Sequence, residues 1–434
     1  MKSKELYEEI LEILEGDFSK YKNDYLRLKE MEKSSEAYYD GQPVPFLYSP
    51  RFFNEEEMLD LHSIVDKSVE LFDRVVELYK KEEGFRQLFG FPKNLEELIL
   101  LENPLEKVYP MARMDVFYRG LDDFSFCEIN TDGSSAMNED RVLKELFFDS
   151  ELYKTLKARG YEIEGFELFE SWVEYVLSNW NKNTPPRIGI LDTDIDNDEF
   201  RRFGAHFEKR GCEVDYVMPQ ELDVDRDGYL AFKGKPLDYI YRRLVTSDFY
   251  KLYDELPKLV EGIRCGKTQL FGPIASQIIH NKVLFFVLHH PDVQHFFTPE
   301  QREFVKKHVP YTALVDEKLA KNPQFIEHKD EYLLKPTDSY ASRGIFLGRD
   351  MDSEQWRDTL ESLVGREYLI QAFAKLPAIE MLSFEEGVKS FNHMTGIFVY
   401  NGKLQGFFSR ACQGPIIASS YGGKSLATLS IKKV

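Results

Sequence analysis

The sequence predicts a mixed fold that combines α+β and α/β parts, and three observations lead to this fold class. Two short runs at residues 113–116 and 127–130 alternate polar and apolar residues on either side of a turn-forming segment, as paired antiparallel strands do. A strand, a helix and a second strand follow one another between residues 187 and 218, which is the order of a Rossmann-like unit. Amphipathic helix patterns occupy much of residues 1–105. The 434 residues can bury a large core and should form two or three domains.

The composition favours a folded, cytoplasmic protein of enzyme size. The net charge of −19 should repel nucleic acid and anionic lipid, so we expect neither a nucleic-acid nor a membrane partner. The densest apolar run, residues 283–288, is far too short to span a membrane. The four cysteines are widely spaced and form no Cys-x-x-Cys pair, which predicts a reducing compartment rather than a disulfide framework.

The N-terminal region is expected to be a helical scaffold. Residues 1 to about 35 carry apolar residues at helical spacing, and residues 41–45 break the chain. Asn54 followed by three glutamates is typical of a capped helix start, and the helix should run to about residue 83. A further helix is expected over residues 94–101. No chemistry can be assigned to these segments.

The two alternating runs at 113–130 predict a hairpin that turns about residues 121 and 122. In that register the position numbers of facing residues share one sum, so Asp115 faces Glu128 and Arg113 faces Asn130 on one side of the ribbon. The other side is then apolar and carries Met114, Val116, Cys127 and Ile129.

Two carboxylates that face each other across a strand pair repel, so this register requires a positive charge nearby. Arg113 can supply part of it. A Mg²⁺ ion held by Asp115, Glu128 and the amide oxygen of Asn130 would supply more, because hard cations of this kind prefer oxygen ligands. The alternative is an edge hairpin whose acids are solvated in water, or a bulge that changes the register. The sequence pattern leaves both open.

Helices are predicted after the hairpin at residues 138–156 and 166–180, and again at 199–210 between the strands of the Rossmann-like unit. The loop after the first of these strands contains Asp192 and Asp194. Their spacing is similar to the Asp-x-Asp motif of sugar-nucleotide transferases, which makes a glycosyltransferase an alternative function.

The order Arg-x-Asp, turn, Glu-x-Asn-x-Asp resembles the metal-binding segment of the glutathionylspermidine synthase-like family, the circularly permuted ATP-grasp ligases. The resemblance implies that Asp115, Glu128 and Asn130 hold Mg²⁺ and that Arg113 stabilises the reacting acyl group. The family often continues with Thr-Pro-Ser, whereas this chain has Gly-Ser-Ser at residues 133–135.

The same resemblance implies an ATP site in the second half of the chain. Lys282, and Lys335 at the end of a predicted strand, would reach the nucleotide phosphates. The small-residue loop 337–344, with Ser342 and Gly344, would cover the phosphates with backbone N–H groups. A bare loop between two strands is the alternative.

The adenine side and a further arginine complete the implied ATP site. Residues 367–373 resemble the strand beside the base, where Ile370 and Gln371 would contribute. Arg410 follows a hairpin around Asn401-Gly402, a strong turn signal, and matches the family's arginine near the triphosphate. A surface ion pair is the alternative for Arg410.

Because the metal carboxylates precede the phosphate lysines, the resemblance implies an ATP-grasp fold in circularly permuted order. The expected parts are an N-terminal helical region (1–105), a metal and acyl-substrate part (106–183), a Rossmann-like preATP-grasp domain (184–300) and an ATP-binding part (301–434). The implied activity is a carboxylate–amine ligase that uses ATP and Mg²⁺ and forms an acyl phosphate. Its substrates would be a peptide or glutathione-like acid and a polyamine-like amine, and the oligomeric state is left open. A non-catalytic nucleotide-binding protein of the same fold is the other rival.

Overall fold

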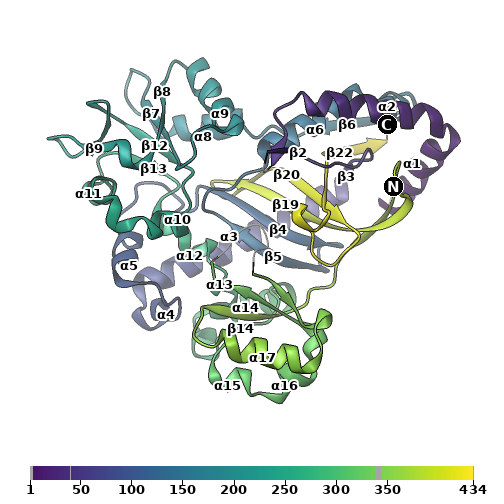
Figure 1. Cartoon of the computed structure of the whole chain (residues 1–434). Helices are drawn as coiled ribbons and strands as arrows, with labels where there is room; N and C mark the ends of the chain where they lie inside the picture. The colour runs from purple at the N-terminus through teal and green to yellow at the C-terminus, as the bar shows by residue number, and fades with distance from the viewer. Residues whose placement is uncertain (1–2, 40, 339–343, 434) are drawn as a thin grey trace.

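The computed structural model describes residues 3–39, 41–338 and 344–433. A central antiparallel sheet is flanked by a parallel-sheet part, a smaller antiparallel part and the N-terminal helices (Figure 1). The prediction of a mixed α+β and α/β fold is therefore confirmed. In the described ranges, no helix combines the length and the apolar character needed to cross a membrane.

The central sheet has the strand order β21-β20-β19-β4-β5, and β18 also pairs with β19. Its strands are β4 (Met111–Tyr118), β5 (Phe124–Asn130), β18 (Ala378–Ser383), β19 (Gly387–Tyr400), β20 (Lys403–Cys412) and β21 (Lys424–Leu426). The hairpin β4–β5 thus lies beside β19, a strand from near the other end of the chain. Every residue of β4 is buried. Two of its polar side chains, Arg113 and Asp115, belong to the site described below.

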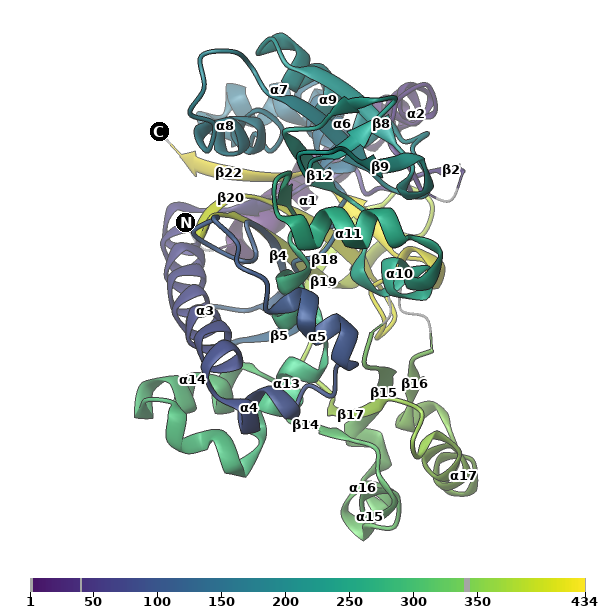
Figure 2. The ribbon, with the colours of Figure 1, turned by 90° about the vertical axis from the view of Figure 1, so that its left-hand side faces the viewer.

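One face of the central sheet packs on α3 (Glu55–Lys81), which lies behind the strands in Figure 1 and beside them in Figure 2. Asn54 and Glu57 form the capping box at its start, as the run of glutamates predicted. Apolar side chains of α3 share one core with Met114 and Val116 of β4. The opposite face of β4 carries the polar residues.

The hairpin β19–β20 turns at Asn401-Gly402, as predicted. Tyr400 pairs with Lys403, and both turn residues have positive φ (45° and 80°), which is the requirement of a type I′ turn.

The parallel sheet has the order β13-β12-β7-β8 and contains the predicted strand, helix and strand. Its elements are β7 (Arg187–Leu191), α9 (Asp198–Lys209), β8 (Glu213–Val217), β12 (Tyr239–Arg242), α11 (Pro257–Cys265) and β13 (Gln269–Phe271). A small sheet of β9 (Leu222–Val224), β10 (Leu230–Phe232) and β11 (Lys235–Pro236) is inserted before β12.

The smaller antiparallel part has the strand order β14-β17-β15-β16, with its own apolar core and helices on its outer face (Figure 1). It consists of β14 (Thr312–Leu314), α15 (Glu317–Ala320), α16 (Pro323–Glu327), β15 (Tyr332–Pro336), β16 (Phe346–Leu347), α17 (Ser353–Leu363) and β17 (Tyr368–Ala372).

The helix predicted for residues 1–35 is two helices, α1 (Ser3–Gly16) and α2 (Phe18–Lys33), because Asp17 caps the second. The helix predicted for residues 138–156 is likewise broken at Ser150, whose side chain accepts the N–H of Tyr153. The pieces are α6 (Met137–Asp149) and α7 (Glu151–Ala158). In each case a short polar side chain satisfies the new helix start.

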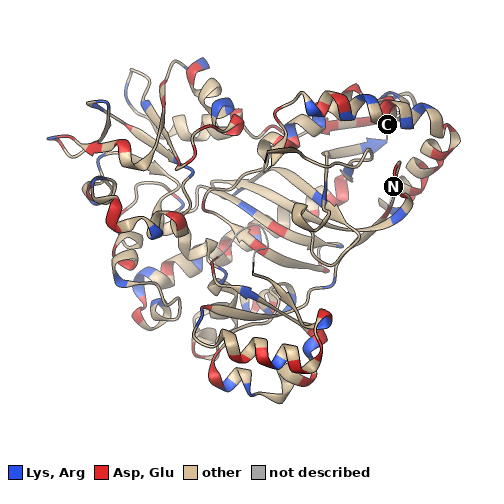
Figure 3. Cartoon of the chain, viewed as in Figure 1, with Lys and Arg blue, Asp and Glu red and all other residues tan. Residues whose placement is uncertain are grey.

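The remaining elements include two further sheets, of order β1-β2 and β3-β22-β6, and several helices. They are β1 (Tyr38–Tyr39), β2 (Gln42–Pro43), β3 (Arg51–Phe53), α4 (Glu83–Gln87), α5 (Lys93–Ile99), β6 (Tyr161–Gly165), α8 (Glu170–Ser178), α10 (Thr246–Lys251), α12 (Gln277–His280), α13 (Val283–His289), α14 (Pro299–His308) and β22 (Thr428–Lys433). In Figure 3, acidic and basic residues are interspersed along the outer helices, so the net charge of −19 is spread over many elements.

Candidate functional site

A cavity of about 400 Å³ lies where the central sheet, the parallel-sheet part and the smaller antiparallel part meet. Among the predicted site residues, it is lined by Arg113, Glu128, Asn130, Lys282, Lys335, Gln371 and Arg410. These residues lie far apart in the sequence, and the fold brings them to one place.

The hairpin β4–β5 has the predicted register at its inner end. Arg113 pairs with Asn130 and Asp115 pairs with Glu128, so the two acids do lie opposite each other. The register shifts by one residue after Asp115, which leaves Cys127 in a β-bulge.

The bulge corrects the placement of Cys127, which we expected on the apolar side with Met114 and Val116. Its side chain instead packs near Phe117 and Met394 and lines the cavity. The physical reason is that one extra residue reverses the alternation of sides along a strand.

Arg113 supplies the positive charge that the opposed acids require. Its Nε donates to Asp115 Oδ1 at 2.7 Å and its Nη2 donates to Asp115 Oδ2 at 2.9 Å. The side chains of Arg113 and Asp115 are 8% and 0% exposed. Burial opposes the charge on Arg113, but the adjacent Asp115 carboxylate outweighs it and raises the pKa of Arg113 above its usual range.

Gly396 of β19 makes room for this ion pair. It lies opposite Asp115 in the sheet, and a Cβ atom there would stand 2.8 Å from Asp115 Oδ1 and 2.9 Å from Arg113 Cδ. Any larger residue at this position would push against the bidentate pair.

Glu128 faces the cavity beside two polar partners. Asn130 Nδ2 donates to Glu128 Oε1 at 3.2 Å and also approaches Asp115 Oδ2 at 3.4 Å, while Lys282 Nζ lies 3.5 Å from Glu128 Oε2. Burial alone would raise the pKa of Glu128, but the charges of Lys282 and Arg113 lower it to about 2. Glu128 is therefore ionised at neutral pH.

The predicted magnesium ligands have the right chemistry, because carboxylate and amide oxygens are hard ligands. Glu128 and Asn130 line the cavity, whereas Asp115 is 0% exposed and accepts from Arg113 at both of its oxygens. The Asn130 amide directs its N–H₂ group towards both acids, so it would have to turn over to present its oxygen to a cation. Among the described residues, no group of three or more His, Cys, Asp or Glu side chains is arranged to hold a metal. The set Asp115, Glu128 and Asn130 has only two such side chains, so its role as a magnesium site stays a prediction.

The two predicted phosphate lysines lie at the same cavity. Lys335 is 5% exposed, and its Nζ is 3.5 Å from the carbonyl oxygen of Cys127 on the bulge. Burial and the nearby charge of Lys282 lower the pKa of Lys335 to about 8. The backbone N–H of Lys282 donates to the carbonyl of Thr337, which ties the two lysine-bearing segments together.

The residues predicted to bind the base are divided by the structure. The Gln371 amide donates to Thr312 Oγ1 at 2.9 Å at the cavity wall. Ile370 is fully buried in the core of the smaller antiparallel part and does not line the cavity. Beyond the strand, Ala372 and Phe373 line the cavity.

The predicted phosphate loop is described only in part, because Ser342 lies outside the described residues. Gly344 has φ +74°, and a Cβ atom there would stand 2.7 Å from Tyr368 Oη and 3.0 Å from Pro336 Cγ. This close approach requires glycine. The nucleotide roles of both residues stay predictions.

Arg410 lies on β20 with its side chain 21% exposed, so it is not part of a surface ion pair. Its Nη2 is 4.0 Å from Asp115 Oδ2, and its buried Nε has no hydrogen-bond partner among the described residues. Burial and the neighbouring Arg113 lower the pKa of Arg410 below its usual range. The guanidinium is available for an anion in the cavity.

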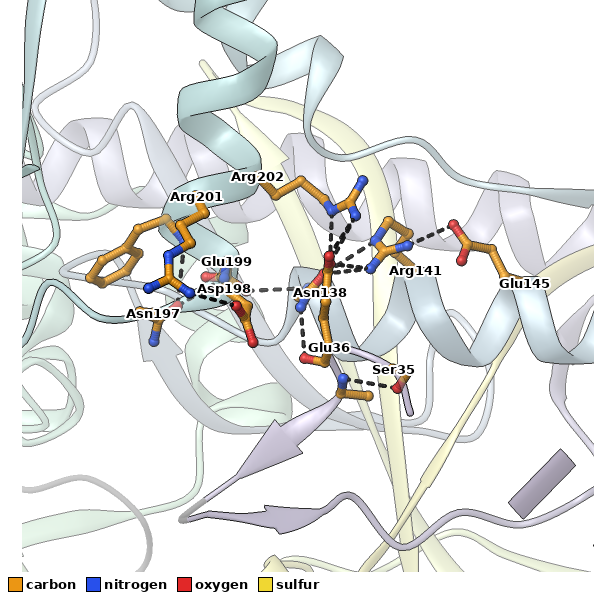
Figure 4. Close-up of polar contacts among 12 residues, drawn as sticks. Ser35, Glu36, Asn138, Arg141, Glu145, Asn197, Asp198, Glu199, Arg201 and Arg202 are labelled. Atoms are coloured by element: carbon orange, nitrogen blue, oxygen red, sulfur yellow. Dashed lines mark hydrogen bonds and ion pairs between the residues drawn. The ribbon is translucent and has the colours of Figure 1, made fainter. Parts of the chain in front are cut away.

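The sequence alone did not single out three charged residues around the start of α6. One of them, Glu139, belongs to α6, and the other two, Glu199 and Arg243, come from elsewhere in the chain. Glu199 of α9 accepts the backbone N–H groups of Met137 and Asn138 at 2.9 and 3.2 Å, and Arg243 donates to Glu199 at 2.8 Å (Figure 4 shows Glu199 beside Asn138). Glu139, on the first turn of α6, lines the cavity together with Arg243. An acid in a helix first turn was the only sequence signal.

The Asp-x-Asp motif is not assembled as a pair. Asp192 lines the cavity after β7, but its Oδ1 accepts the N–H groups of Thr193 and Asp194 within its own loop. Asp194 is exposed and does not line the cavity.

Comparisons with known proteins give a sequence relative and similar solved structures. No family model matches the chain. The chain is 26% identical over 184 residues to "ATP-grasp enzyme ankG" of Aspergillus thermomutatus, a match that covers 38% of this chain and 37% of that protein. The chain thus matches little more than a third of the relative's length.

One similar solved structure is a glutathione synthetase-like effector (GSS30) from Globodera pallida in its apo form. The TM-score is 0.56 at 13% identity, and the match covers 94% of this chain and 96% of that one. The chain is therefore a distant sequence relative of an ATP-grasp enzyme and has the fold of a glutathione synthetase-like protein.

Proposed function

We propose that this chain is an ATP- and Mg²⁺-dependent, ADP-forming ligase that joins a carboxylate to an amine through an acyl phosphate, as in glutathionylspermidine synthase-like enzymes. The observation that carries the proposal is that Glu128, one of the two opposed acids, lines the same cavity as Lys282, Lys335 and Arg410. Glu128 of β5 lies 3.5 Å from Lys282, and the buried Lys335 lies behind the bulge beside it. The relative's name and the shared fold support the same class of reaction.

The proposed reaction needs ATP because a carboxylate is a poor electrophile and its condensation with an amine in water is uphill. Lys282 and Lys335 would neutralise the phosphate charge that builds up during transfer to the acid. Arg113 would hold the acyl phosphate, and the Arg410 guanidinium, which lines the cavity, would donate to an oxygen of the transferred group. Mg²⁺, when bound to Asp115, Glu128 and Asn130, would screen the phosphate oxygens from these acids.

The substrates proposed for this site are small molecules. A cavity of about 400 Å³ is of the size that holds a drug-sized ligand. A peptide or glutathione-like acid and a polyamine-like amine are the first candidates. The acidic groups Glu139 and Asp192, which also line the cavity, are compatible with a cationic amine.

The glycosyltransferase alternative has little structural support, because Asp194 is exposed and does not line the cavity with Asp192. The non-catalytic alternative predicts nucleotide binding without turnover. The experiment described next distinguishes both alternatives from the ligase.

The test measures ADP release from Mg-ATP across a panel of peptides and polyamines, followed by mass measurement of any condensed product. Lys335→Met should remove turnover, whereas the exposed Lys307→Met, a matched control on α14, should not. ADP release with a product of the summed mass minus water supports the proposal. ATP binding without ADP release for every pair indicates a non-catalytic protein, and hydrolysis of a sugar nucleotide instead indicates a transferase.

A further inference from the structure

We infer that Glu139 is the catalytic residue that accepts the proton of the amine substrate, an inference that rests on the proposed ligase function. Glu139 lines the cavity from the first turn of α6, and the loop before that turn is bound by Arg113.

Hydrogen bonds to the backbone on both sides fix the start of α6, which carries Glu139. Arg113 uses its third donor, Nη1, to bind the carbonyl oxygen of Ser135 at 2.8 Å, and α6 starts two residues later. Glu199 holds the first two N–H groups of α6 from the other side. These contacts fix the start of α6, and Glu139 and Arg113 line the same cavity close enough for their charges to interact. An amine that attacks an acyl phosphate held by Arg113 would enter this cavity.

Glu139 differs from its acidic neighbours in having no cation of its own. Asp115 is paired with Arg113, Glu199 with Arg243, and Asp140 with Lys144. No described Lys or Arg side chain forms an ion pair with Glu139. An acid that lines a ligand cavity and lacks an internal partner is available for a cation that enters, and an alkylammonium group is such a cation.

The charged groups around Glu139 also suit proton transfer near neutral pH. Burial and the carboxylate of Glu199 raise the pKa of Glu139 to about 7, against the opposing effects of its own backbone N–H, Arg113 and Arg410. A base whose pKa lies near the working pH combines a useful ionised fraction with a useful driving force.

The step balances as follows. The ammonium group gives one proton to the Glu139 carboxylate, and the freed nitrogen lone pair attacks the acyl carbon. The C–N bond forms, the bond between the acyl carbon and the phosphate oxygen breaks, and the nitrogen loses its second proton to the departing phosphate, which leaves as hydrogen phosphate. Glu139 then releases its proton to water, so the net products are the amide, hydrogen phosphate and one proton.

A structural role for Glu139 makes a different prediction. An acid in the first turn stabilises a helix by its interaction with the helix dipole. The loss of that interaction would lower protein stability, and it would reduce the reactions with all nucleophiles alike. A nucleophile that needs no deprotonation separates the two roles.

The experiment uses the full chain with Mg-ATP, each acid of the panel above, and either hydroxylamine or spermidine. Hydroxylamine is largely uncharged at neutral pH and traps acyl phosphates as hydroxamates, whereas the amines of spermidine carry protons. We expect Glu139→Gln to form hydroxamate at nearly the wild-type rate and to lose amide formation by about 100-fold or more. Glu139→Asp should recover part of the loss. Glu145→Gln is the matched control, since this exposed acid of the same helix pairs with Arg141 (Figure 4).

Each outcome has a distinct meaning. If Glu139→Gln condenses both nucleophiles at wild-type rates, or loses both equally, Glu139 is not the proton acceptor and the ligase proposal stands. If the wild type forms neither ADP nor hydroxamate with any acid, the ligase proposal fails and the inference fails with it. A carbon-13 titration of glutamate-labelled protein adds a readout that needs no substrate. A resonance that is missing in Glu139→Gln should titrate near pH 7, and an ordinary value for that resonance overturns the inference.

Discussion

Arg113 and Asp115 lie two residues apart on one face of β4 and form a bidentate ion pair at 2.7 and 2.9 Å, in which the Asp115 side chain is fully buried. The pair answers the electrostatic problem of the opposed acids, and it also means that Arg113 serves the fold as well as the proposed chemistry. Five predictions follow from the contacts around it and from the phosphate side of the cavity.

Arg113→Ala should lower the free energy of unfolding as well as abolish turnover. The change leaves the Asp115 carboxylate buried without a partner, which typically costs about 3–5 kcal/mol. Urea unfolding measures the loss. Arg201→Ala, which removes an exposed ion pair on α9, should cost no more than about 1 kcal/mol. Equal losses of unfolding free energy in the two variants would mean that the buried Arg113–Asp115 pair stabilises the fold no more than an exposed pair does.

Gly396→Ala should disturb the same pair from the neighbouring strand. The new methyl group would stand 2.8 Å from Asp115 Oδ1, and overpacking of this kind typically costs about 1–3 kcal/mol. Turnover should fall with stability because Arg113 must shift. Gly414→Ala is the control, since its nearest neighbour, Cys412 Sγ, would be at an ordinary 3.7 Å. A stable, fully active Gly396→Ala protein would refute the tight fit.

Glu128→Gln should change the dependence of the enzyme on magnesium. It removes one charged oxygen ligand from the proposed site, so the Mg²⁺ concentration for half-maximal ADP release should rise by about tenfold or more. Chelation with EDTA should stop turnover of the wild type. Glu145→Gln provides the control again. An unchanged magnesium requirement in Glu128→Gln would reject this metal site.

Lys335 should make both stability and nucleotide affinity depend on pH. Its pKa is lowered to about 8 in the folded chain, and an ordinary lysine has a pKa of about 10.4. Between these values the unfolded chain holds a proton that the folded chain has released, so this residue makes stability rise with pH across that window.

Bound triphosphate favours the charged form of Lys335, so ATP binding should take up protons near pH 8 and weaken at higher pH. Calorimetry in buffers of different ionisation enthalpy measures the uptake. Lys335→Met should bind ATP at least about tenfold more weakly, as expected for the loss of a charge-assisted hydrogen bond. The variant should also lose the proton uptake, and its persistence would assign the effect to another group.

Gly344→Ala should weaken nucleotide binding more than a matched glycine change in the same part of the chain. Gly344 and Gly365 have nearly equal φ values of +74° and +73°, so alanine costs about 1–2 kcal/mol of backbone strain at either. Only at Gly344 would the new Cβ also meet Tyr368 and Pro336. ATP titrations of both variants isolate the contact, and equal affinities would show that the segment at Gly344 does not influence the nucleotide.

Local signals explain the parts of the fold that sequence reasoning obtained. The turn at Asn401-Gly402, the cap at Asn54 and the facing of Asp115 with Glu128 each depend on residues close together in the chain. A bulge in this hairpin was left open by the sequence pattern, but no local residue marks Cys127 as its position.

Tertiary contacts explain what was missed. Ile370 and Gln371 are adjacent in the sequence, yet one packs in the core and the other lines the cavity. The importance of Gly396 and Glu139 depends on the packing of β19 and the start of α6 near Arg113, which the sequence does not show. A sequence shows which residues could ionise or bind, and only the fold shows which of them share a space.

The neighbour of β4 in the central sheet is β19, which is synthesised much later than the hairpin that carries the acids. At ribosomal speeds of about 5–20 residues per second, the hairpin waits on the order of tens of seconds with one edge unpaired. During that time nothing covers Asp115 from the β19 side, so water can solvate the acids. The ion pair becomes buried only when β19 pairs with β4, so completion of this sheet is a late step in folding during synthesis.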